Sequence, residues 1–332
     1  MTAFASSRPA RRTAYVPSAA LVPEVLRGSV LAVARMISRA EAGYAEAAEA
    51  LAEIYRHSGK AHVLGITGVP GAGKSTLVAA LIRAFAADGH KVGVVAVDPS
   101  SPFSGGAILG DRVRMSEAAQ SCQAFVRSMA TRGHLGGLAR ATLQAVDVLD
   151  AAGYSPIIIE TVGVGQDEVE VVTAAHTIVV LSAPGLGDDI QAIKAGILEI
   201  ADIHAVSKSD RPDASATVAA LRGMMSLGPA RPGSDWQTPV LPVSSLSGER
   251  INELKDAISR HWDHLRDSGE LRERERSIGR TRILGTARQL FQDRFKRDTG
   301  ELEAHVQAVV SRTTDPSAAA CLLLGWDNEV LA

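Results

Sequence analysis

The stretch HVLGITGVPGAGKST, residues 62–76, decides the fold. It begins as a short apolar run typical of a buried strand, passes through three glycines and continues with the apolar spacing of a helix. Within it, Gly68, Gly73, Lys74 and Ser75 match the phosphate-binding pattern G-x-x-x-x-G-K-[ST]. Glycines in such a loop let backbone N–H groups curl around a phosphate, and the helix that follows points its positive end at the same anion. The stretch therefore predicts that the chain binds a nucleoside triphosphate.

Two side chains of this loop have predicted roles in catalysis. Lys74 is expected to reach the β- and γ-phosphates, and the Ser75 hydroxyl is expected to bind Mg²⁺. The alternative, a tight turn before a helix with no ligand, is disfavoured because the strand and the helix that confirm the pattern are both present. The residues predicted to surround the phosphates are Gly68, Pro70, Gly71, Ala72, Gly73, Lys74, Ser75 and Thr76.

The composition limits which classes of partner and which cellular compartment are expected. The 332 residues include 35 Lys and Arg against 37 Asp and Glu, which is not the basic surplus of a nucleic-acid-binding domain. We expect protein and nucleotide partners and no nucleic acid. Cys122 and Cys321 lie far apart, which argues against structural zinc and a disulfide framework and favours a reducing compartment. No apolar run approaches the ~18 residues that span a bilayer, so no membrane partner is expected.

The N-terminal residues 1–20 contain Arg8, Arg11 and Arg12 but no acidic residue and no apolar centre of a secretory signal. We interpret them as a disordered tail of a cytoplasmic protein. A mitochondrial presequence is the alternative interpretation.

From residue 61 onward, short apolar runs alternate with longer helical patterns. This alternation predicts an α/β fold, a P-loop NTPase with a mainly parallel, doubly wound sheet. Predicted strands cover residues 62–67, 91–97, 124–127, 156–160, 177–182, 203–207 and 240–243, and the clearest helices in this region cover 74–88, 138–152, 189–200, 214–225 and 251–265.

Helical segments flank this nucleotide-binding domain, which we assign to residues 61–268. Residues 21–60 are predicted to form two helices, and residues 269–332 form a C-terminal helical segment. The long apolar seam of the C-terminal segment favours self-association, with packing within the chain as the alternative. His261 and His264 fall on one helical face, and we predict that both are solvated.

Acidic residues follow two of the predicted strands, at the sheet edge where ligands of such folds bind. Asp98 ends the second strand and Asp111 follows a glycine-rich segment, so both are candidate Mg²⁺ ligands together with Ser75. An Asx turn and a helix cap are their alternative roles. Glu160 ends the fourth strand and is a further candidate metal ligand. Gln166 is a candidate for orienting the attacking water, or else it begins the next helix.

The candidate catalytic residues are therefore Lys74, Asp98, Asp111, Glu160 and Gln166. These motifs contain no arginine placed to act as an arginine finger, the residue that stabilises charge in the transition state. Its absence from them predicts slow intrinsic hydrolysis that a partner accelerates.

Two later segments predict recognition of guanine. After the sixth strand, Lys208 and Asp210 fit the [N/T]-K-x-D tetrad of G proteins, in which the Asp pairs with guanine N1 and N2 and the Lys packs along the base. Ser207 stands where Asn is usual, and its side chain is shorter. Ser244, Ser245 and Leu246 follow the last strand, at the position of a second base-contacting loop.

A glycine-rich and acidic segment also follows the fifth strand. It contains Asp188, Asp189, Gln191 and Lys194 and is predicted to be a mobile loop beside the nucleotide. A capped helix that begins at Asp188 or Asp189 is the alternative.

Taken together, these segments resemble the MeaB/ArgK family of P-loop GTPases of the SIMIBI class, from about Arg27 to Leu324. The resemblance rests on the ordered set GITGVPGAGKST (65–76), VDPSS (97–101), ILGD (108–111), LGG (135–137), ETVGVGQ (160–166), PGLGD (184–188) with Gln191 and Lys194, and DP (315–316) followed by AAA (318–320). The glycine-rich loop alone is shared by thousands of nucleotidases, whereas the ordered set is specific.

The resemblance implies a homodimeric GTPase that uses GTP/GDP and Mg²⁺. It implies a chaperone of an adenosylcobalamin-dependent acyl-CoA mutase, notably methylmalonyl-CoA mutase, which gates cofactor loading and protects the mutase. Asp98 and Asp111 would belong to a first switch, Glu160 to a second, and the loop 188–194 to a third that communicates with the mutase. The C-terminal helices would form the dimer. Leu186, Asp189 and Ser207 depart from the family pattern, so a related hydroxyacyl-CoA mutase is an alternative partner.

Two other functions share the phosphate-binding loop. One is a kinase that phosphorylates a small molecule or a transport protein, which the guanine-reading pair Lys208 and Asp210 disfavours. The other is a metal-delivery GTPase, which needs a Cys or His cluster that the sequence does not provide.

Overall fold

A computed structural model describes residues 15–98, 112–130, 140–161, 174–184, 200–227, 234–297 and 299–325. The chain divides into two compact units, residues 1–278 and residues 279–332.

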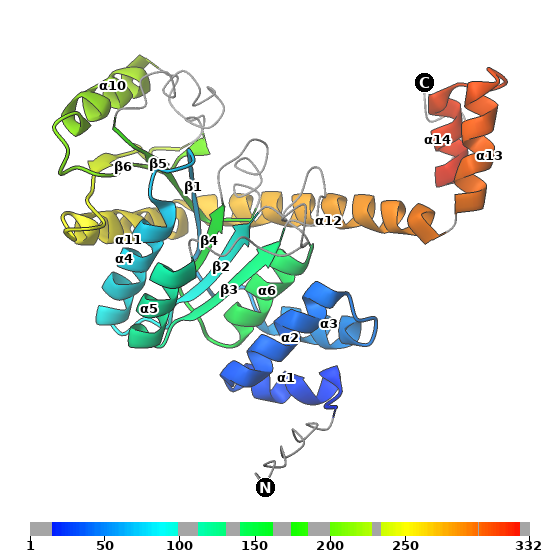
Figure 1. The fold of residues 1–332 in the computed structure, drawn as a ribbon, viewed down its shortest axis with the longest axis horizontal. Helices are drawn as coiled ribbons and strands as arrows, with labels where there is room; N and C mark the ends of the chain where they lie inside the picture. Colours follow the sequence, from blue (N-terminus) through cyan, green and yellow to red (C-terminus); the bar gives the residue numbers. More distant parts are fainter. Residues whose placement is uncertain are drawn as a thin grey trace, which may run out of the picture. The chain divides into compact units, whose positions relative to one another are not determined.

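The described part of the first unit is built on one parallel sheet of seven strands (Figure 1). The strand order is β3-β2-β4-β1-β5-β6-β7, and each neighbouring pair is parallel. This arrangement confirms the predicted fold class. The strands are β1 (Val63–Gly68), β2 (Gly93–Asp98), β3 (Phe125–Ala130), β4 (Ile157–Thr161), β5 (Thr177–Ser182), β6 (Ile203–Val206) and β7 (Val240–Pro242).

Helices cover both faces of the sheet, because strands buried on two sides need apolar cover on each. Alternate residues of β4 show the two faces. Ile157 and Ile159 pack into one core, whereas Ile158 packs into the other. The first face is covered by α6 (Arg140–Ala151), and the second by α4 (Lys74–Ala87), α5 (Arg112–Cys122) and α11 (Ile251–Ser268), while α10 (Ala214–Leu227) packs beside β6 and β7.

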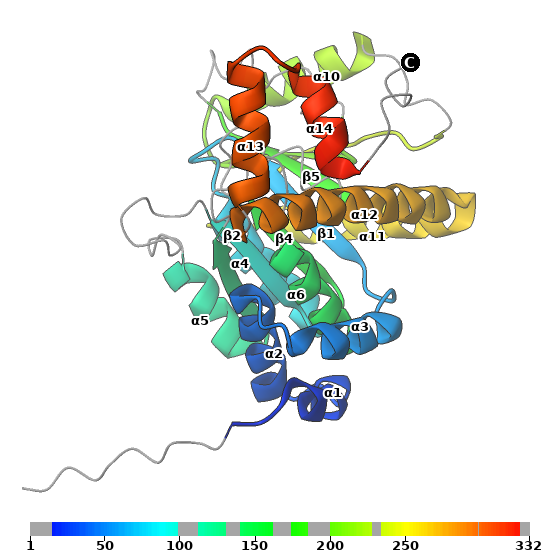
Figure 2. The ribbon, with the colours of Figure 1, turned by 90° about the vertical axis from the view of Figure 1, so that its right-hand side faces the viewer.

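The N-terminal segment contains three helices, not the two predicted: α1 (Ser18–Leu26), α2 (Val30–Ala42) and α3 (Ala47–His57). Gly28, with φ +77°, follows α1, and the Ser29 side chain caps α2, so one periodic run is split into two helices. Figure 2 shows the three helices gathered beside α6.

The predicted disordered tail, residues 1–20, also extends too far. Ser18 already begins α1 and is fully buried, with its hydroxyl 2.6 Å from the Glu46 carboxylate. Hydrogen bonds from Ser18 and Tyr15 lower the pKa of Glu46 to about 2.

The Asp150 carboxylate fixes the connection between the N-terminal helices and the sheet. Asp150, near the end of α6, accepts hydrogen bonds from the backbone N–H groups of Gly59, Lys60 and Ala61 at 2.7–3.2 Å. These three residues connect α3 to β1. The carboxylate therefore fixes the chain immediately before the strand that leads to the phosphate-binding loop.

Histidines and tryptophans form a largely buried cluster at the edge of the sheet where β1 and β5 begin. The Thr177 hydroxyl lies 2.7 Å from His62 Nε2 and 2.8 Å from His261 Nδ1. The Asp202 carboxylate lies 3.4 Å from His261 and forms a two-point ion pair with Arg274. His261 is 1% exposed, so the prediction that it is solvated is wrong.

The error has a simple origin, because helical spacing shows which residues share a face but not what covers that face. His264 is also partly buried, against Trp236 and Glu270. Helix α12 (Glu270–Arg297) begins at this cluster.

The second unit contains the C-terminal part of α12, together with α13 (Thr299–Val310) and α14 (Pro316–Leu324). Helices α13 and α14 pack on each other, and the Asp315 side chain caps α14. Large apolar side chains stay exposed in this unit by itself: Ile283, Leu284, Leu290, Leu302, Val306, Val310, Leu322 and Leu324.

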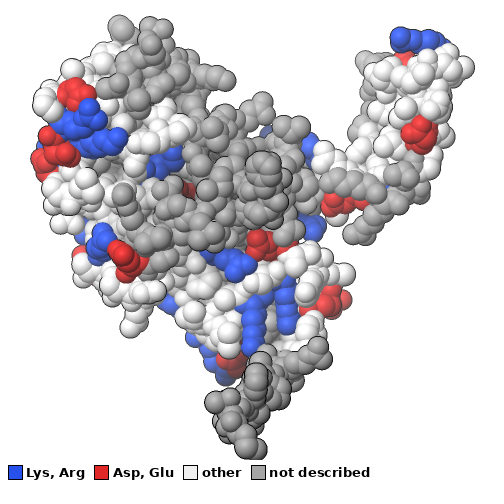
Figure 3. Space-filling view, viewed as in Figure 1, with Lys and Arg blue, Asp and Glu red and all other residues white. Residues whose placement is uncertain are grey.

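Charged side chains of both signs are interspersed over the described part of the face in Figure 3. Among the described helices, none has the length and apolar character needed to cross a membrane.

Candidate functional site

The phosphate-binding loop runs from β1 into α4, and two of its glycines show why this backbone needs residues without a side chain. A Cβ atom on Gly68 would lie 2.0 Å from the carbonyl oxygen of Leu181 on the neighbouring strand β5. Gly73 has φ +90°, a left-handed conformation that glycine adopts without strain. Gly68 thus lets the loop pass close to β5, and Gly73 lets the backbone turn so that α4 can begin at the next residue.

The Lys74 side chain folds back over the phosphate-binding loop, where two carbonyl oxygens hold its ammonium group. The side chain is buried, and its ammonium group donates hydrogen bonds to the carbonyl oxygens of Gly68 at 2.7 Å and Val69 at 3.1 Å. These carbonyls keep a positive charge beside the first turn of α4, whose free N–H groups also favour an anion. Loop, lysine and helix end therefore form one anion-binding arrangement.

Ser75 and Glu160 meet beside this arrangement. The Ser75 hydroxyl donates to Oε1 of Glu160 at 2.6 Å, and Glu160 is buried at the carboxyl end of β4. A hydroxyl and a carboxylate are oxygen donors of the kind that Mg²⁺ prefers. These two residues, 85 positions apart in the sequence, thus lie together, and their oxygen atoms are of the kind that a Mg²⁺ site needs.

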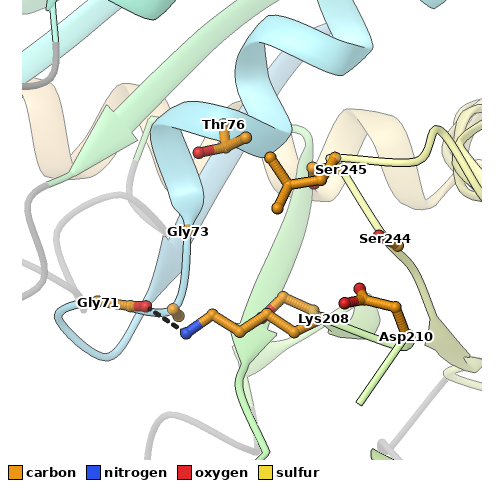
Figure 4. A pocket seen from close by; sticks show the side chains of 10 residues that line it. Gly71, Gly73, Thr76, Lys208, Asp210, Ser244 and Ser245 are labelled. Atoms are coloured by element: carbon orange, nitrogen blue, oxygen red, sulfur yellow. Dashed lines mark hydrogen bonds between the residues drawn. The ribbon is translucent and has the colours of Figure 1, made fainter.

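A cavity of about 190 Å³ opens next to the loop (Figure 4). Three segments line it: the loop with the first turn of α4, the residues after β6, and the residues after β7. Every lining residue is one that the sequence predicts to bind the nucleotide. They are Gly71, Ala72, Gly73, Thr76, Ser207, Lys208, Asp210, Ser244, Ser245 and Leu246.

The other four predicted nucleotide-binding residues, Gly68, Pro70, Lys74 and Ser75, belong to the same loop and the same helix end.

Hydrogen bonds hold the residues after β6 to the phosphate-binding loop and to the end of β5. Figure 4 shows the Lys208 side chain extended toward the loop, where its ammonium group donates to the Gly71 carbonyl oxygen at 3.2 Å. The backbone N–H of Ser207 donates to the Ser182 carbonyl oxygen at 2.8 Å, and its hydroxyl donates to the same oxygen at 3.1 Å. Sequence reasoning missed Ser182, because a backbone acceptor leaves no signature in the residue type.

Several candidate residues, or their side chains, lie outside the part of the chain that the structure describes. Asp98 is the last residue of β2, next to β4, but its side chain lies outside the description. Asp111, Gln166 and the loop residues Asp188, Asp189, Gln191 and Lys194 also lie outside the described residues. Among the described residues, no cluster of three or more His, Cys, Asp or Glu is arranged to hold a metal ion.

Residues 33–299 match the family described as methylmalonyl-CoA mutase-associated GTPase MeaB. The chain belongs to the MeaB family. A relative from Pyrococcus horikoshii is 41% identical over 305 residues, which cover 92% of this chain and 96% of that protein. The mouse protein named methylmalonic aciduria type A homolog, mitochondrial, is 35% identical over 271 residues, 79% of this chain and 64% of its own.

A solved structure is also similar to this member of the MeaB family. It is described as an LAO/AO transport system kinase, superposes with a TM-score of 0.68 at 28% identity, and the match covers 93% of this chain and 96% of that one. The family assignment means that the cavity belongs to a GTPase fold that binds guanine nucleotides.

Proposed function

We propose that this protein is a GTP-hydrolysing chaperone of an adenosylcobalamin-dependent acyl-CoA mutase. The observation that carries the proposal is the cavity, which joins a phosphate-binding loop to the predicted guanine-reading residues in a chain of a mutase-associated GTPase family.

Each end of the cavity suits one end of a guanine nucleotide. The Asp210 carboxylate accepts the N1 and N2 protons of guanine, and the Lys208 stem lies along the base. At the other end, the loop N–H groups and Lys74 take the β- and γ-phosphates. Lys208 already contacts the Gly71 carbonyl, so the base-reading residues and the phosphate loop support each other.

Ser75 and Glu160 would hold a Mg²⁺ ion, with Asp98 and Asp111 as further candidates. Bound Mg²⁺ neutralises charge on the phosphoryl oxygens as the γ-phosphoryl group passes to water. In this chain, Lys74 adds a second positive charge at the same oxygens, and Glu160 orients the Ser75 hydroxyl through their 2.6 Å hydrogen bond. Hydrolysis by the protein alone is slow, and the mutase accelerates it.

The family description and the name of the mouse relative support a mutase as the partner. We assign contact with the mutase to the loop 188–194 of this chain. The partner would be a methylmalonyl-CoA mutase or a hydroxyacyl-CoA mutase. The exposed apolar side chains of the second unit support a homodimer formed by the C-terminal helices, because large exposed apolar patches mark interaction sites.

The first experiment measures phosphate release from GTP by the purified protein with Mg²⁺ or EDTA, with and without a purified mutase. Ser75→Ala and Glu160→Gln should each lower the Mg²⁺-dependent rate by about 100-fold or more, because metal stabilisation of the transferred group is worth several kcal/mol. Ser226→Ala, on the exposed surface of α10, is the matched control. A rate that no mutase changes would contradict the chaperone proposal.

The kinase remains the alternative because the similar solved structure is described as one. Pull-down of cell proteins on the GTP-analogue and GDP forms separates the two functions. Recovery of a mutase supports the chaperone, whereas phosphate transfer to a metabolite or transport protein supports the kinase.

A further inference from the structure

The hydroxyl of Ser207 lies in the wall of the cavity but is engaged elsewhere. Its proton goes to the Ser182 carbonyl oxygen at 3.1 Å, the same oxygen that accepts the Ser207 backbone N–H, and the residue is 4% exposed. A hydroxyl has one proton to donate. The Ser207 side chain therefore joins the segment after β6 to the end of β5, and it has no donor left for a nucleotide.

This connection holds a strained piece of backbone. Lys208 has φ +55°, a left-handed conformation that a non-glycine residue keeps only when its surroundings impose it. Contacts on three sides do so: Ser207 with β5, the Lys208 ammonium group with Gly71, and the Ser209 N–H with the Val243 carbonyl oxygen at 3.1 Å. Asp210 follows directly and takes its position from them.

We propose that Ser207 is a positioning residue that sets purine selectivity through Asp210 and is not itself a nucleotide ligand. The inference rests on the proposed binding of guanine nucleotides. A carboxylate that accepts two parallel N–H groups depends on its orientation, whereas the contact of the Lys208 stem with the base is common to all purines. Loss of the Ser207 hydrogen bond should therefore weaken the contact with the guanine 2-amino group more than the rest of the binding.

The test measures the dissociation constants of GDP and of inosine diphosphate, which lacks the 2-amino group. In Ser207→Ala the preference for GDP should fall by about fivefold, the usual effect of one hydrogen bond. Ser207→Cys, which keeps the shape of the side chain at slightly larger volume but is a weak donor, should do the same and gives the answer if the alanine variant does not fold. Ser207→Thr keeps the hydroxyl, so its preference for GDP should be that of the wild type and not that of the alanine and cysteine variants.

Ser226→Ala is the matched control, because the Ser226 hydroxyl also donates to a backbone carbonyl, that of Gly223 at 2.7 Å, but on α10 and outside the cavity. It should leave both dissociation constants unchanged. Equal loss of GDP and inosine diphosphate affinity in the alanine and cysteine variants would overturn the inference, as would failure of threonine to restore the preference. A wild-type protein that binds no GDP would overturn the proposed function instead.

Discussion

Asp210 is the residue on which the choice of base depends most directly. Its carboxylate lines the cavity and offers two acceptors to the N1 and N2 protons of guanine. Asp210→Asn replaces one acceptor by an NH₂ donor, which matches the N1 proton and 2-oxo group of xanthine. The variant should lose about 100-fold or more in GTP affinity, because two charge-assisted hydrogen bonds are affected, and should gain affinity for XTP.

Competition between GTP, XTP and ATP for a fluorescent nucleotide measures this change. A variant that still prefers GTP would show that another residue reads the base.

Much of the site could be predicted residue by residue, because its chemistry depends on side chains in fixed spacings. Lys74, Lys208 and Asp210 are recognisable from their motifs, and the cavity brings the last two together with the loop. The connection from Ser207 to Ser182 could not be predicted. It depends on which carbonyl lies beside the hydroxyl, and only the packing of β5 against β6 decides that.

Among the elements, the connection between α3 and β1 depends on the Asp150 carboxylate at the end of α6. Asp150→Ala removes the acceptor of three backbone N–H groups and should lower the free energy of unfolding by about 2–4 kcal/mol. Asp150→Asn keeps one acceptor oxygen and should cost less. Urea unfolding followed by circular dichroism measures both.

The exposed Asp263 of α11 provides the control, and Asp263→Ala should unfold as the wild type does. An equal loss in the two alanine variants would remove any special role for Asp150.

The histidine cluster where β1 and β5 begin predicts acid sensitivity. Burial and the nearby Arg274 charge lower the pKa of His176 to about 4, and burial lowers the pKa of His62 well below its usual value. These two histidines therefore bind fewer protons in the folded protein than in the unfolded chain below about pH 6.5, so they leave stability unchanged between pH 7 and that pH and lower it progressively toward pH 4.

His176 alone should contribute about 2 kcal/mol of this loss by pH 4.5. His176→Gln keeps an acceptor for the Val63 N–H but does not titrate, so its unfolding free energy should fall less between pH 7 and pH 4.5. Identical pH profiles for the two proteins would contradict this assignment.

The strands could be predicted to within a few residues because their mainly apolar runs are short and bounded by turns. Thr177–Ser182 matches its prediction, and the others differ at their ends. Helix α5 was not predicted, since Arg112–Cys122 shows little apolar periodicity and owes its burial to contacts with α4 and β3. Tertiary packing also decides the fate of His261, which no local pattern distinguishes from a surface residue.

At the scale of the whole molecule, the second unit should determine the oligomeric state. Ile283 is 71% exposed and Leu290 is 55% exposed in the single chain, and a partner that covers them gains their burial free energy. The double variant Ile283→Asp with Leu290→Asp should sediment as a monomer when the wild type sediments as a dimer.

Gln292→Asp is the control, because the exposed Gln292 lies on the opposite side of α12 from these two residues. It should leave the dimer intact. A wild type that is monomeric at micromolar concentration would show that the apolar side chains serve another partner.

The ribosome makes β1 long before it makes either strand that pairs with it. β1 ends at Gly68, whereas β4 begins at Ile157 and β5 ends at Ser182. At roughly 5–20 residues per second, several seconds separate these events. During that time an apolar strand with two open edges is a template for pairing with other nascent chains. A ribosome stalled before Ile157 therefore exposes the strand of the nucleotide loop to the folding machinery of the cell.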